Sequence, residues 1–188
     1  MTDLAPLTAL GAAAHRTAAF GALTLTENAD LGLASLAQRR GAPVPVPMGL
    51  ALPGPGLWHA GNGIAAFWTG PGQWMLEGED RAEEDFARTV KLAAPECSVT
   101  EQTDGFVALE VVSSAGAAPI ERLCEKLVNV DLGRFGPGSA TRTGLHHMTV
   151  FVIRRAEDRL AILGMRSLAG SLWHAVEGAA QHLEGAAT

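Results

Sequence analysis

One glycine-rich segment has the spacing of a dinucleotide-binding loop. Residues 61–66 read G-N-G-I-A-A, which matches G-x-G-x-x-A, and acidic residues follow at about the distance of a ribose-binding group. Such a loop must follow a buried strand and open a helix whose amino terminus holds the pyrophosphate. Here the turn-forming sequence P-G-P-G-L-W-H-A precedes it and the strand-like A-F-W follows. We therefore expect a turn that enters a strand, and no dinucleotide site.

Six histidines raise the question of a metal site. His146 and His147 are adjacent on a predicted strand, so their side chains point to opposite faces and cannot share an ion. His174 and His182 lie about two turns apart on a predicted helix, which is farther than the i, i+4 spacing that a helical zinc site uses. The spacing predicts no metal ligand on this chain.

Hydroxyl and carboxylate groups give no clear catalytic pattern. The chain has no G-x-S-x-G motif, and Ser113-Ser114 has no histidine nearby in sequence. Glu101, Asp104 and Glu110 lie on or beside one predicted hairpin, where alternating charges are typical of a solvated face; a carboxylate-pair active site is the alternative. We predict no catalytic and no cofactor-binding residue.

The elements around these residues indicate an α+β fold of mostly antiparallel sheets with covering helices. Asp104-Gly105 is a strong turn signal, and it predicts a hairpin from residues 98–103 and 106–112. The remaining predicted strands are 23–26, 64–68, 74–77, 139–144, 147–154 and 159–164. Helices are predicted from Asp30 to about residue 41, over about 80–93 with Asp80 and Glu83 at capping-box spacing, from Pro119, and from Ser167 to Gly185.

Residues 1–20, rich in alanine and other small residues, are predicted to be a flexible amino-terminal arm. Residues 21–188 are predicted to form a single α+β domain, with two small fused lobes as the alternative. A chain of 188 residues can bury close to 70% of the surface that its unfolded state exposes. It therefore needs no disulfide or metal in order to fold.

Charge and hydropathy exclude several classes of partner. The 14 Lys and Arg and 20 Asp and Glu give a net charge of −6, without a long basic run, which argues against nucleic acid and anionic lipid. No uncharged apolar run approaches the ~18 residues of a spanning helix, and no basic residue precedes the apolar amino terminus as in a secretory signal. Cys97 and Cys124 form no C-x-x-C pair and are expected to be reduced. We expect a soluble, cytoplasmic protein.

Some apolar residues are poorly explained by the predicted core. Alternating prolines, including Pro45 and Pro47, force an extended path from Pro43 to Gly56, which is either a strap across the domain or a docking edge for another subunit. Trp58 and Trp173 lie off the apolar stripes, where a large amphipathic ring is often an interface anchor. These four residues are the predicted subunit interface.

The order and spacing of six segments within residues 21–181 resemble the gamma subunit of heterotetrameric sarcosine oxidase, a relative of the glycine-cleavage T protein. The segments read G-A-L-T-L-T-E-N-A-D-L-G-L-A-S-L-A-Q-R-R-G, F-W-T-G-P-G-Q-W-M-L, S-V-T-E-Q-T-D-G-F-V-A-L-E-V-V, V-D-L-G-R-F-G-P-G, T-R-T-G-L-H-H-M-T-V-F-V-I-R-R and M-R-S-L-A-G-S-L-W-H-A-V. The resemblance implies the fold of the amino-terminal domain of the T protein, an aminomethyltransferase.

The resemblance also implies a role in an αβγδ enzyme that oxidatively demethylates sarcosine to glycine and passes the one-carbon unit to tetrahydrofolate. FAD, FMN, NAD, tetrahydrofolate and zinc would then lie on the alpha, beta and delta subunits, with none on this chain. T-protein relatives carry an acidic pair near the region where this chain reads L-H-H-M at residues 145–148, which argues against a folate site.

Two interpretations follow. In the first, which we favour, the chain is a non-catalytic structural gamma subunit of a sarcosine oxidase, or of a related N-methyl amino acid dehydrogenase. In the second it is a free-standing folate-binding or aminomethyltransferase-like enzyme. Size favours the first, because the full T-protein architecture has additional lobes that 188 residues cannot accommodate.

Overall fold

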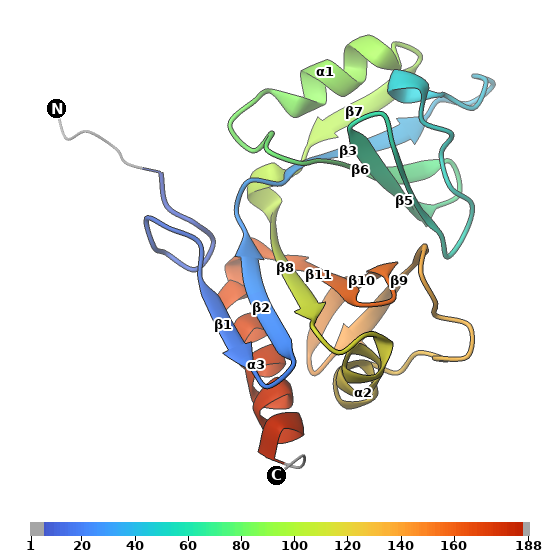
Figure 1. Cartoon of the computed structure of the whole chain (residues 1–188). Coiled ribbons are helices and arrows are strands. Elements are labelled where there is room, and N and C mark those ends of the chain that lie inside the picture. Colours follow the sequence, from blue (N-terminus) through green and yellow to red (C-terminus); the bar gives the residue numbers. More distant parts are fainter. Residues whose placement is uncertain (1–5, 186–188) are drawn as a thin grey trace, which may run out of the picture.

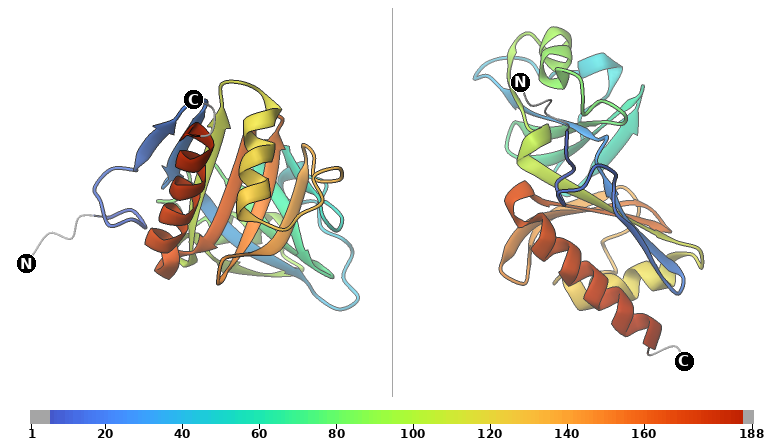
Figure 2. Two further views of the ribbon diagram at one scale, coloured as in Figure 1. Left: turned by 90° about the horizontal axis from the view of Figure 1, so that it is seen from below. Right: turned by 90° about the vertical axis from the view of Figure 1, so that its left-hand side faces the viewer.

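The computed structural model describes residues 6–185, which fold into two lobes, each built on an antiparallel sheet (Figure 1). The two sheets face each other, and the helices cover their outer faces: α1 lies on one lobe, and α2 and α3 lie side by side on the other (Figure 2). The α+β class predicted from the sequence, with antiparallel sheets and covering helices, is confirmed.

The six-stranded lobe has the strand order β1-β2-β8-β11-β10-β9. Its strands are β1 (Thr17–Phe20), β2 (Leu23–Asn28), β8 (Phe106–Ser113), β9 (Ser139–Leu145), β10 (Met148–Ala156) and β11 (Arg159–Met165). Its helices are α2 (Ala117–Leu127) and α3 (Ala169–Gly185), and the 3-10 turn η3 (Arg166–Leu168) leads into α3.

The five-stranded lobe has the strand order β4-β5-β6-β3-β7. Its strands are β3 (Gly32–Gln38), β4 (Trp58–Gly61), β5 (Ile64–Gly70), β6 (Gln73–Gly78) and β7 (Cys97–Glu101), with helix α1 (Phe86–Ala93) and the 3-10 turn η1 (Pro47–Gly49). This lobe is contiguous in sequence and is inserted between β2 and β8, which pair directly in the other sheet.

Three apolar layers hold the chain together. One lies between the six-stranded sheet and α2 and α3, and includes Leu109, Leu123 and Trp173. A second lies between the five-stranded sheet and α1, and the third fills the space between the two sheets. Because both sheets are covered on both faces, their central strands carry apolar side chains in consecutive positions.

This two-sided burial explains why the helix predicted from Asp30 is wrong. Residues 32–38 form β3, whose Ala34 and Leu36 face the layer under α1 while Leu33 faces the layer between the sheets. A short apolar run of this kind has no period that distinguishes a strand from a buried helix.

The hairpin predicted at Asp104-Gly105 is also wrong. β7 pairs with β3 and β8 pairs with β2 and β11, so the two strands belong to different sheets. Residues 103–105 form the 3-10 turn η2 (Thr103–Gly105) where the chain returns to the six-stranded lobe. The turn residues were recognised correctly, but the direction of the chain after a turn is set by tertiary packing.

Two predicted helix starts are displaced. α1 begins at Phe86, and the Asp85 carboxylate accepts a hydrogen bond from Arg88 N at 2.9 Å, so Asp85 is the cap in place of Asp80. Asp80 has a φ of 56° and lies in the preceding turn. α3 begins at Ala169, after η3, and the Ser167 side chain makes no capping hydrogen bond.

The predicted arm is partly ordered into the fold. Residues 1–5 lie outside the described part, but Thr17–Phe20 forms β1 and pairs with β2. The segment before β1 is held by Glu27 of β2, whose carboxylate is only 2% exposed. This carboxylate accepts hydrogen bonds from Leu10 N at 3.0 Å and Arg16 N at 3.3 Å. The boundary expected at residue 20 therefore falls inside a β-hairpin.

Trp173 is a core residue, so its assignment to a subunit interface is wrong. Its side chain is fully buried between α3 and the six-stranded sheet, and the Arg16 guanidinium lies 4.6 Å from the ring centroid. A ring with no exposed surface cannot contact a partner. The stripe on α3 is wider than the sequence indicated, because Leu172, Trp173 and Val176 all face the sheet.

We predict that Trp173→Ala lowers the free energy of unfolding by about 3–5 kcal/mol, because it leaves a large cavity in the core. Urea denaturation followed by circular dichroism measures this change. Leu92→Ala, at a side chain that is 76% exposed on α1, is the control and should cost less than about 0.5 kcal/mol. A Trp173→Ala variant as stable as the wild type would contradict the core assignment.

Candidate functional site

Three charged side chains meet between the two sheets. Arg155 of β10 donates from Nη1 and Nη2 to the two carboxylate oxygens of Glu77 on β6, both at 2.9 Å. Its Nε and Nη2 donate to Glu110 of β8 at 3.0–3.2 Å. We call Glu77, Arg155 and Glu110 the inter-sheet cluster; it links the five-stranded lobe to the six-stranded lobe.

Strand alternation positions these side chains. Residues two positions apart in a strand point to the same face of the sheet. The residues two positions before the three charged side chains all belong to the apolar layer between the sheets: Met75 before Glu77, Ala108 before Glu110, and Ile153 before Arg155. β11 runs between β8 and β10, and its residue opposite Glu110 is Ala161. That small side chain leaves space for Arg155 to reach Glu110 across β11.

Trp58 of β4 completes the cluster. Its Nε1 donates to Glu77 Oε2 at 2.7 Å, and the Arg155 guanidinium lies 5.3 Å from the ring centroid. Glu77, 2% exposed, therefore accepts three hydrogen bonds, which compensate the cost of removing its charge from water. The ring also covers the guanidinium and shields it from solvent.

The cluster contains two carboxylates but one guanidinium. Burial raises the pKa of Glu110 to about 7, against the lowering effect of Arg155, and the charges of Glu77 and Glu79 raise it further. Burial by itself lowers the pKa of Arg155, but the two carboxylates raise it above its usual value, so Arg155 stays charged. Glu110 is thus the member of the cluster whose charge changes near neutral pH.

A cavity of about 450 Å³ opens beside the cluster. Trp58, Ile64 and Leu31 form apolar walls, and Glu79 and Arg159 supply charge at the rim. Arg159 is exposed, and its side chain makes no hydrogen bond or ion pair with residues 6–185. The cavity has the volume and the mixed lining of a small-molecule site.

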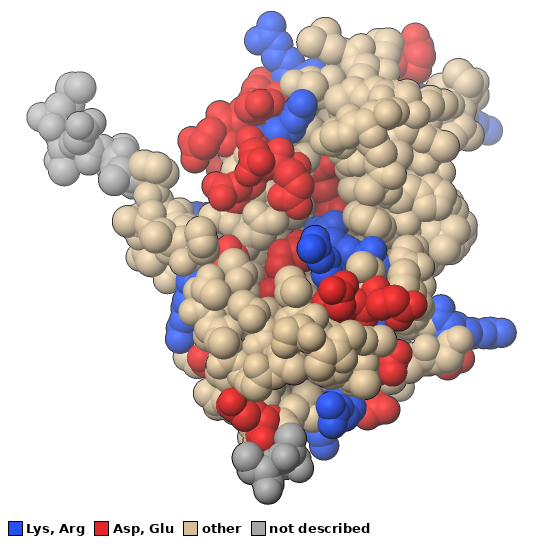
Figure 3. All heavy atoms as spheres, in the orientation of Figure 1, with Lys and Arg blue, Asp and Glu red and all other residues tan. Residues whose placement is uncertain are grey.

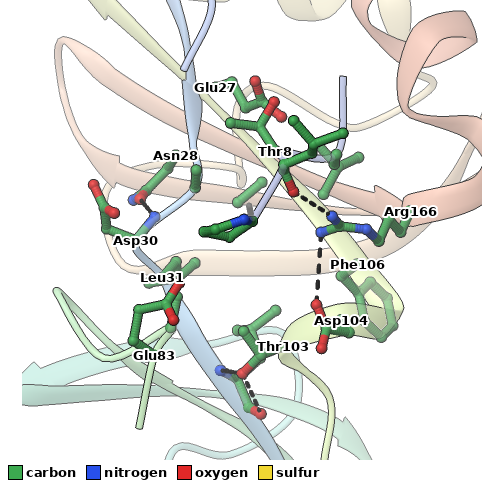
Figure 4. Close-up of a pocket in the computed structure, with 18 of the residues that line it drawn as sticks. Thr8, Glu27, Asn28, Asp30, Leu31, Glu83, Thr103, Asp104, Phe106 and Arg166 are labelled. Atoms are coloured by element: carbon green, nitrogen blue, oxygen red, sulfur yellow. Dashed lines mark hydrogen bonds and ion pairs between the residues drawn. The ribbon is translucent and has the colours of Figure 1, made fainter. Parts of the chain in front are cut away.

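A second cavity, of about 390 Å³, is also lined by Leu31 (Figure 4). Its outer wall is the segment before β1, which Arg166 holds by donating from Nη2 to Leu7 O at 2.9 Å. Arg166 also lies 3.8 Å from Asp104. The opposite rim includes Asp30 and Glu83, which face the cavity without an ion pair among the described residues (Figure 4).

The surface beside this second cavity is acidic. Five exposed carboxylates lie in seven residues between β6 and α1, and acidic side chains gather at the cleft between the lobes (Figure 3). They are Glu79, Asp80, Glu83, Glu84 and Asp85. A negative surface of this kind attracts cationic groups and repels phosphate.

The residues considered for chemistry from the sequence do not form one site. Asn62 and Gly63, with φ of 56° and 76°, make the turn between β4 and β5, so residues 61–66 are the expected strand-entering turn. His146 and His147 form the two-residue turn between β9 and β10, not the strand that was predicted. Within residues 6–185 no three His, Cys, Asp or Glu side chains are arranged to hold a metal ion.

The three carboxylates of the supposed hairpin are separated. Glu101 Oε2 accepts a hydrogen bond from Ala87 N at 2.9 Å, and Oε1 accepts one from Thr103 Oγ1. Burial acts to raise the pKa of Glu101, but these hydrogen bonds lower it overall. Asp104 is exposed, and only Glu110 enters the inter-sheet cluster.

The predicted interface residues differ in exposure. Pro47 is buried at the start of η1, Pro45 is half-buried, and Trp58 is half-buried in the inter-sheet cluster. The segment around Pro45 forms no strand, as expected, and exposes Val44 by 62% and Val46 by 57%. No helix in the described part of the chain is long and apolar enough to cross a membrane.

Sequence reasoning missed Glu77 and Arg155. Glu77 follows the apolar run W-M-L, and Arg155 follows the apolar run V-F-V-I and Arg154. Strand alternation assigns both Glu77 and Arg155 to a buried face. A charge at such a position needs a partner of opposite charge, and this is the signal that could have identified the pair. The partner itself, on a strand 78 residues away, could not be identified from the pattern.

We predict that Arg155→Met destabilises the protein by about 3 kcal/mol near neutral pH, because it leaves the buried Glu77 carboxylate without its cation. The loss should shrink in acid, because the pKa of Glu110 is about 7 and a protonated Glu110 needs no cation. Urea unfolding at about pH 5 and pH 8 tests this. Arg159→Met, the matched loss of an exposed arginine in the same cavity, should change stability by less than about 0.5 kcal/mol.

Two solved structures share this architecture. Heterotetrameric sarcosine oxidase from Corynebacterium sp. U-96, in complex with pyrrole 2-carboxylate, has a chain that matches with a TM-score of 0.74 and 23% identity, over 89% of this chain and 88% of that chain. Glycine cleavage system aminomethyltransferase T from Bartonella henselae matches with a TM-score of 0.56 and 17% identity, over 81% of this chain and 44% of that chain.

A scan against family models and a search of curated proteins return no match. At 23% and 17% identity the likeness is one of fold. The chain spans less than half of the aminomethyltransferase but nearly the whole of the matched sarcosine oxidase chain. It therefore has the α+β fold shared by a chain of heterotetrameric sarcosine oxidase and by part of the glycine-cleavage T protein.

Proposed function

We propose that this chain is a non-catalytic structural gamma subunit of a heterotetrameric sarcosine oxidase. The observation that supports this most is the extent of the match, which covers 89% of this chain and 88% of a chain of the sarcosine oxidase. The aminomethyltransferase of the same fold is a longer chain, because the match covers 81% of this chain but only 44% of that one.

The state of the inter-sheet cluster supports a structural role. Arg155 and Trp58 engage the Glu77 carboxylate on both oxygens, and Arg155 also engages Glu110. The Glu77 carboxylate, held in this way, connects the two lobes and is not free to act as a base on a substrate. A structural role therefore explains the geometry of the Glu77–Arg155 link without a reaction.

In the proposed complex the partners are the alpha, beta and delta subunits. Oxidative demethylation of sarcosine to glycine, with transfer of the one-carbon unit to tetrahydrofolate, takes place on those chains. They would carry FAD, FMN, NAD, tetrahydrofolate and zinc. Cys97 and Cys124 are both free and buried, in keeping with the cytoplasmic location that we propose.

For the subunit interface we propose the proline segment and the cleft beside it. Val44 and Val46 are the most exposed apolar side chains of this segment, and Pro45 lies between them. Trp58 lies at the open end of the inter-sheet layer, where its ring lines the cavity. Exposed apolar side chains on a rigid extended segment lose little entropy when a partner covers them.

The second candidate is a free-standing folate-binding or aminomethyltransferase-like enzyme. The cavity of about 450 Å³ between Trp58 and Arg159 favours it, because the cavity is large enough for a small-molecule ligand. A gamma subunit of a related N-methyl amino acid dehydrogenase is a variant of the first candidate, since the substrate would be selected on another chain.

We expect the purified chain to be colourless, to show no flavin absorbance and to oxidise no sarcosine, because the proposed catalytic cofactors belong to partner subunits. Isothermal titration calorimetry with tetrahydrofolate should show no saturable binding at micromolar concentrations. A flavin spectrum, or micromolar folate binding, would instead support the second candidate, a free-standing enzyme.

We predict that the double variant Val44→Ser/Val46→Ser weakens co-purification with co-expressed sarcosine oxidase subunits while the isolated chain keeps its melting temperature within about 2 °C. Loss of central apolar contacts commonly costs about 2 kcal/mol, which is about 30-fold in affinity. Val112→Ser, a single exposed valine in the six-stranded lobe, is the control. Unchanged assembly of the double variant would exclude this segment from the interface.

A further inference from the structure

The two carboxylates of the inter-sheet cluster compete for one cation. Glu77 is 2% exposed and receives three hydrogen bonds at 2.7–2.9 Å, whereas the Glu110 side chain is 20% exposed and receives bonds at 3.0–3.2 Å, all from Arg155. Glu110 is thus the more weakly held and more accessible acid. If one of the two carboxylates takes up a proton, it is Glu110.

Burial of Glu110 favours that proton, and the charge of Arg155 opposes it. Arg155 on β10 is the cation that acts on Glu110, and Glu77 and Glu79 are the anions. Thr26 of β2, paired with Glu110, carries no charge. Desolvation outweighs the lowering effect of Arg155 and, with a smaller contribution from the two glutamates, raises the pKa of Glu110 to about 7.

The members of the cluster belong to different lobes. Arg155 and Glu110 both lie on the six-stranded sheet, and Glu77 and Trp58 lie on the five-stranded sheet. The bond from Arg155 to Glu77 therefore crosses between the lobes, while the bond to Glu110 stays within one sheet. An ionised Glu110 competes with the inter-lobe bond, and a protonated Glu110 leaves Arg155 balanced one to one by Glu77.

We propose that the inter-sheet cluster is a pH-sensitive junction between the two lobes, in which protonation of Glu110 tightens the Arg155–Glu77 bond and deprotonation loosens it. The adjoining cavity of about 450 Å³ gives solvent, and hence protons, a path to the cluster. This inference concerns the isolated chain and does not depend on the proposed function.

The sign of the stability change follows from linkage. The pKa of Glu110 in the folded chain, about 7, lies above its ordinary value of 4.5, so the folded state binds this proton more tightly than the unfolded state does. The stabilisation is fully present below the ordinary pKa and is lost as the pH rises through about 7. Replacing Glu110 by glutamine keeps a neutral side chain at every pH and removes this dependence.

Nuclear magnetic resonance tests the proposal directly. The side-chain carboxyl carbon of Glu110 is followed from about pH 4 to pH 9, together with the indole N–H signal of Trp58, which reports on Glu77. We expect both to shift with a midpoint near 7, and the Trp58 signal to become flat in Glu110→Gln. Trp74, whose Nε1 donates to Pro53 O at 2.8 Å on the other face of the sheet, should not shift in either protein.

A histidine must be controlled for, because histidines titrate in the same range. His59 is the neighbour of Trp58 in β4, so the Trp58 shift must persist in His59→Gln. In thermal unfolding, the melting temperature of Glu110→Gln relative to the wild type should rise from about pH 5 to pH 8. Glu121→Gln, an exposed glutamate of α2, should run parallel to the wild type.

A Glu110 carbon that titrates at or below 4.5, or a Trp58 signal that keeps its shift in Glu110→Gln, would overturn the proposal. The cluster would then be a fixed ionic link. If Glu110→Gln does not fold, the wild-type carbon titration and the His59→Gln control still decide the question.

Discussion

The structure depends on packing two antiparallel sheets face to face with a charged group inside the contact. Most of the layer between them is apolar, so removal of this surface from water drives the lobes together. At one end of the layer Arg155 bridges Glu77 and Glu110, and the desolvation of these charges opposes the same contact. The ionic bonds offset that cost only when the two sheets are in one relative position. The cluster therefore specifies how the lobes meet, while the apolar layer supplies the stability.

The connectivity makes this contact necessary. The five-stranded lobe is inserted between β2 and β8, and these two strands pair with each other in the six-stranded sheet. The chain therefore leaves the six-stranded sheet after β2 and returns to it at β8, at neighbouring points. Thr103 fastens the return crossing, since its hydroxyl contacts both Leu33 and Glu101. The Arg155–Glu77 bond of the inter-sheet cluster is a further link between the two lobes.

The same geometry relates the site to the proposed role. The two cavities are both lined by Leu31, at the cleft between the lobes, and one wall of the second is the amino-terminal segment. In a subunit of a larger assembly, such a cleft offers surface from both lobes at once. The structural likeness covers 88% of one chain of a heterotetrameric sarcosine oxidase and 44% of an aminomethyltransferase T, and it is a likeness of fold.

Local patterns in the sequence determined most of the elements. The strands after residue 138, the stripe of α2 and the turn at Asn62 and Gly63 were all predicted, because hydrophobic period and turn chemistry are properties of neighbouring residues. Tertiary structure alone decided three things: that β3 is a strand buried on both faces, that β7 and β8 belong to different sheets, and that Glu77 meets Arg155. Each depends on residues far apart in the chain, and the free energy of burial and charge pairing that selects them exists only once the two sheets are together.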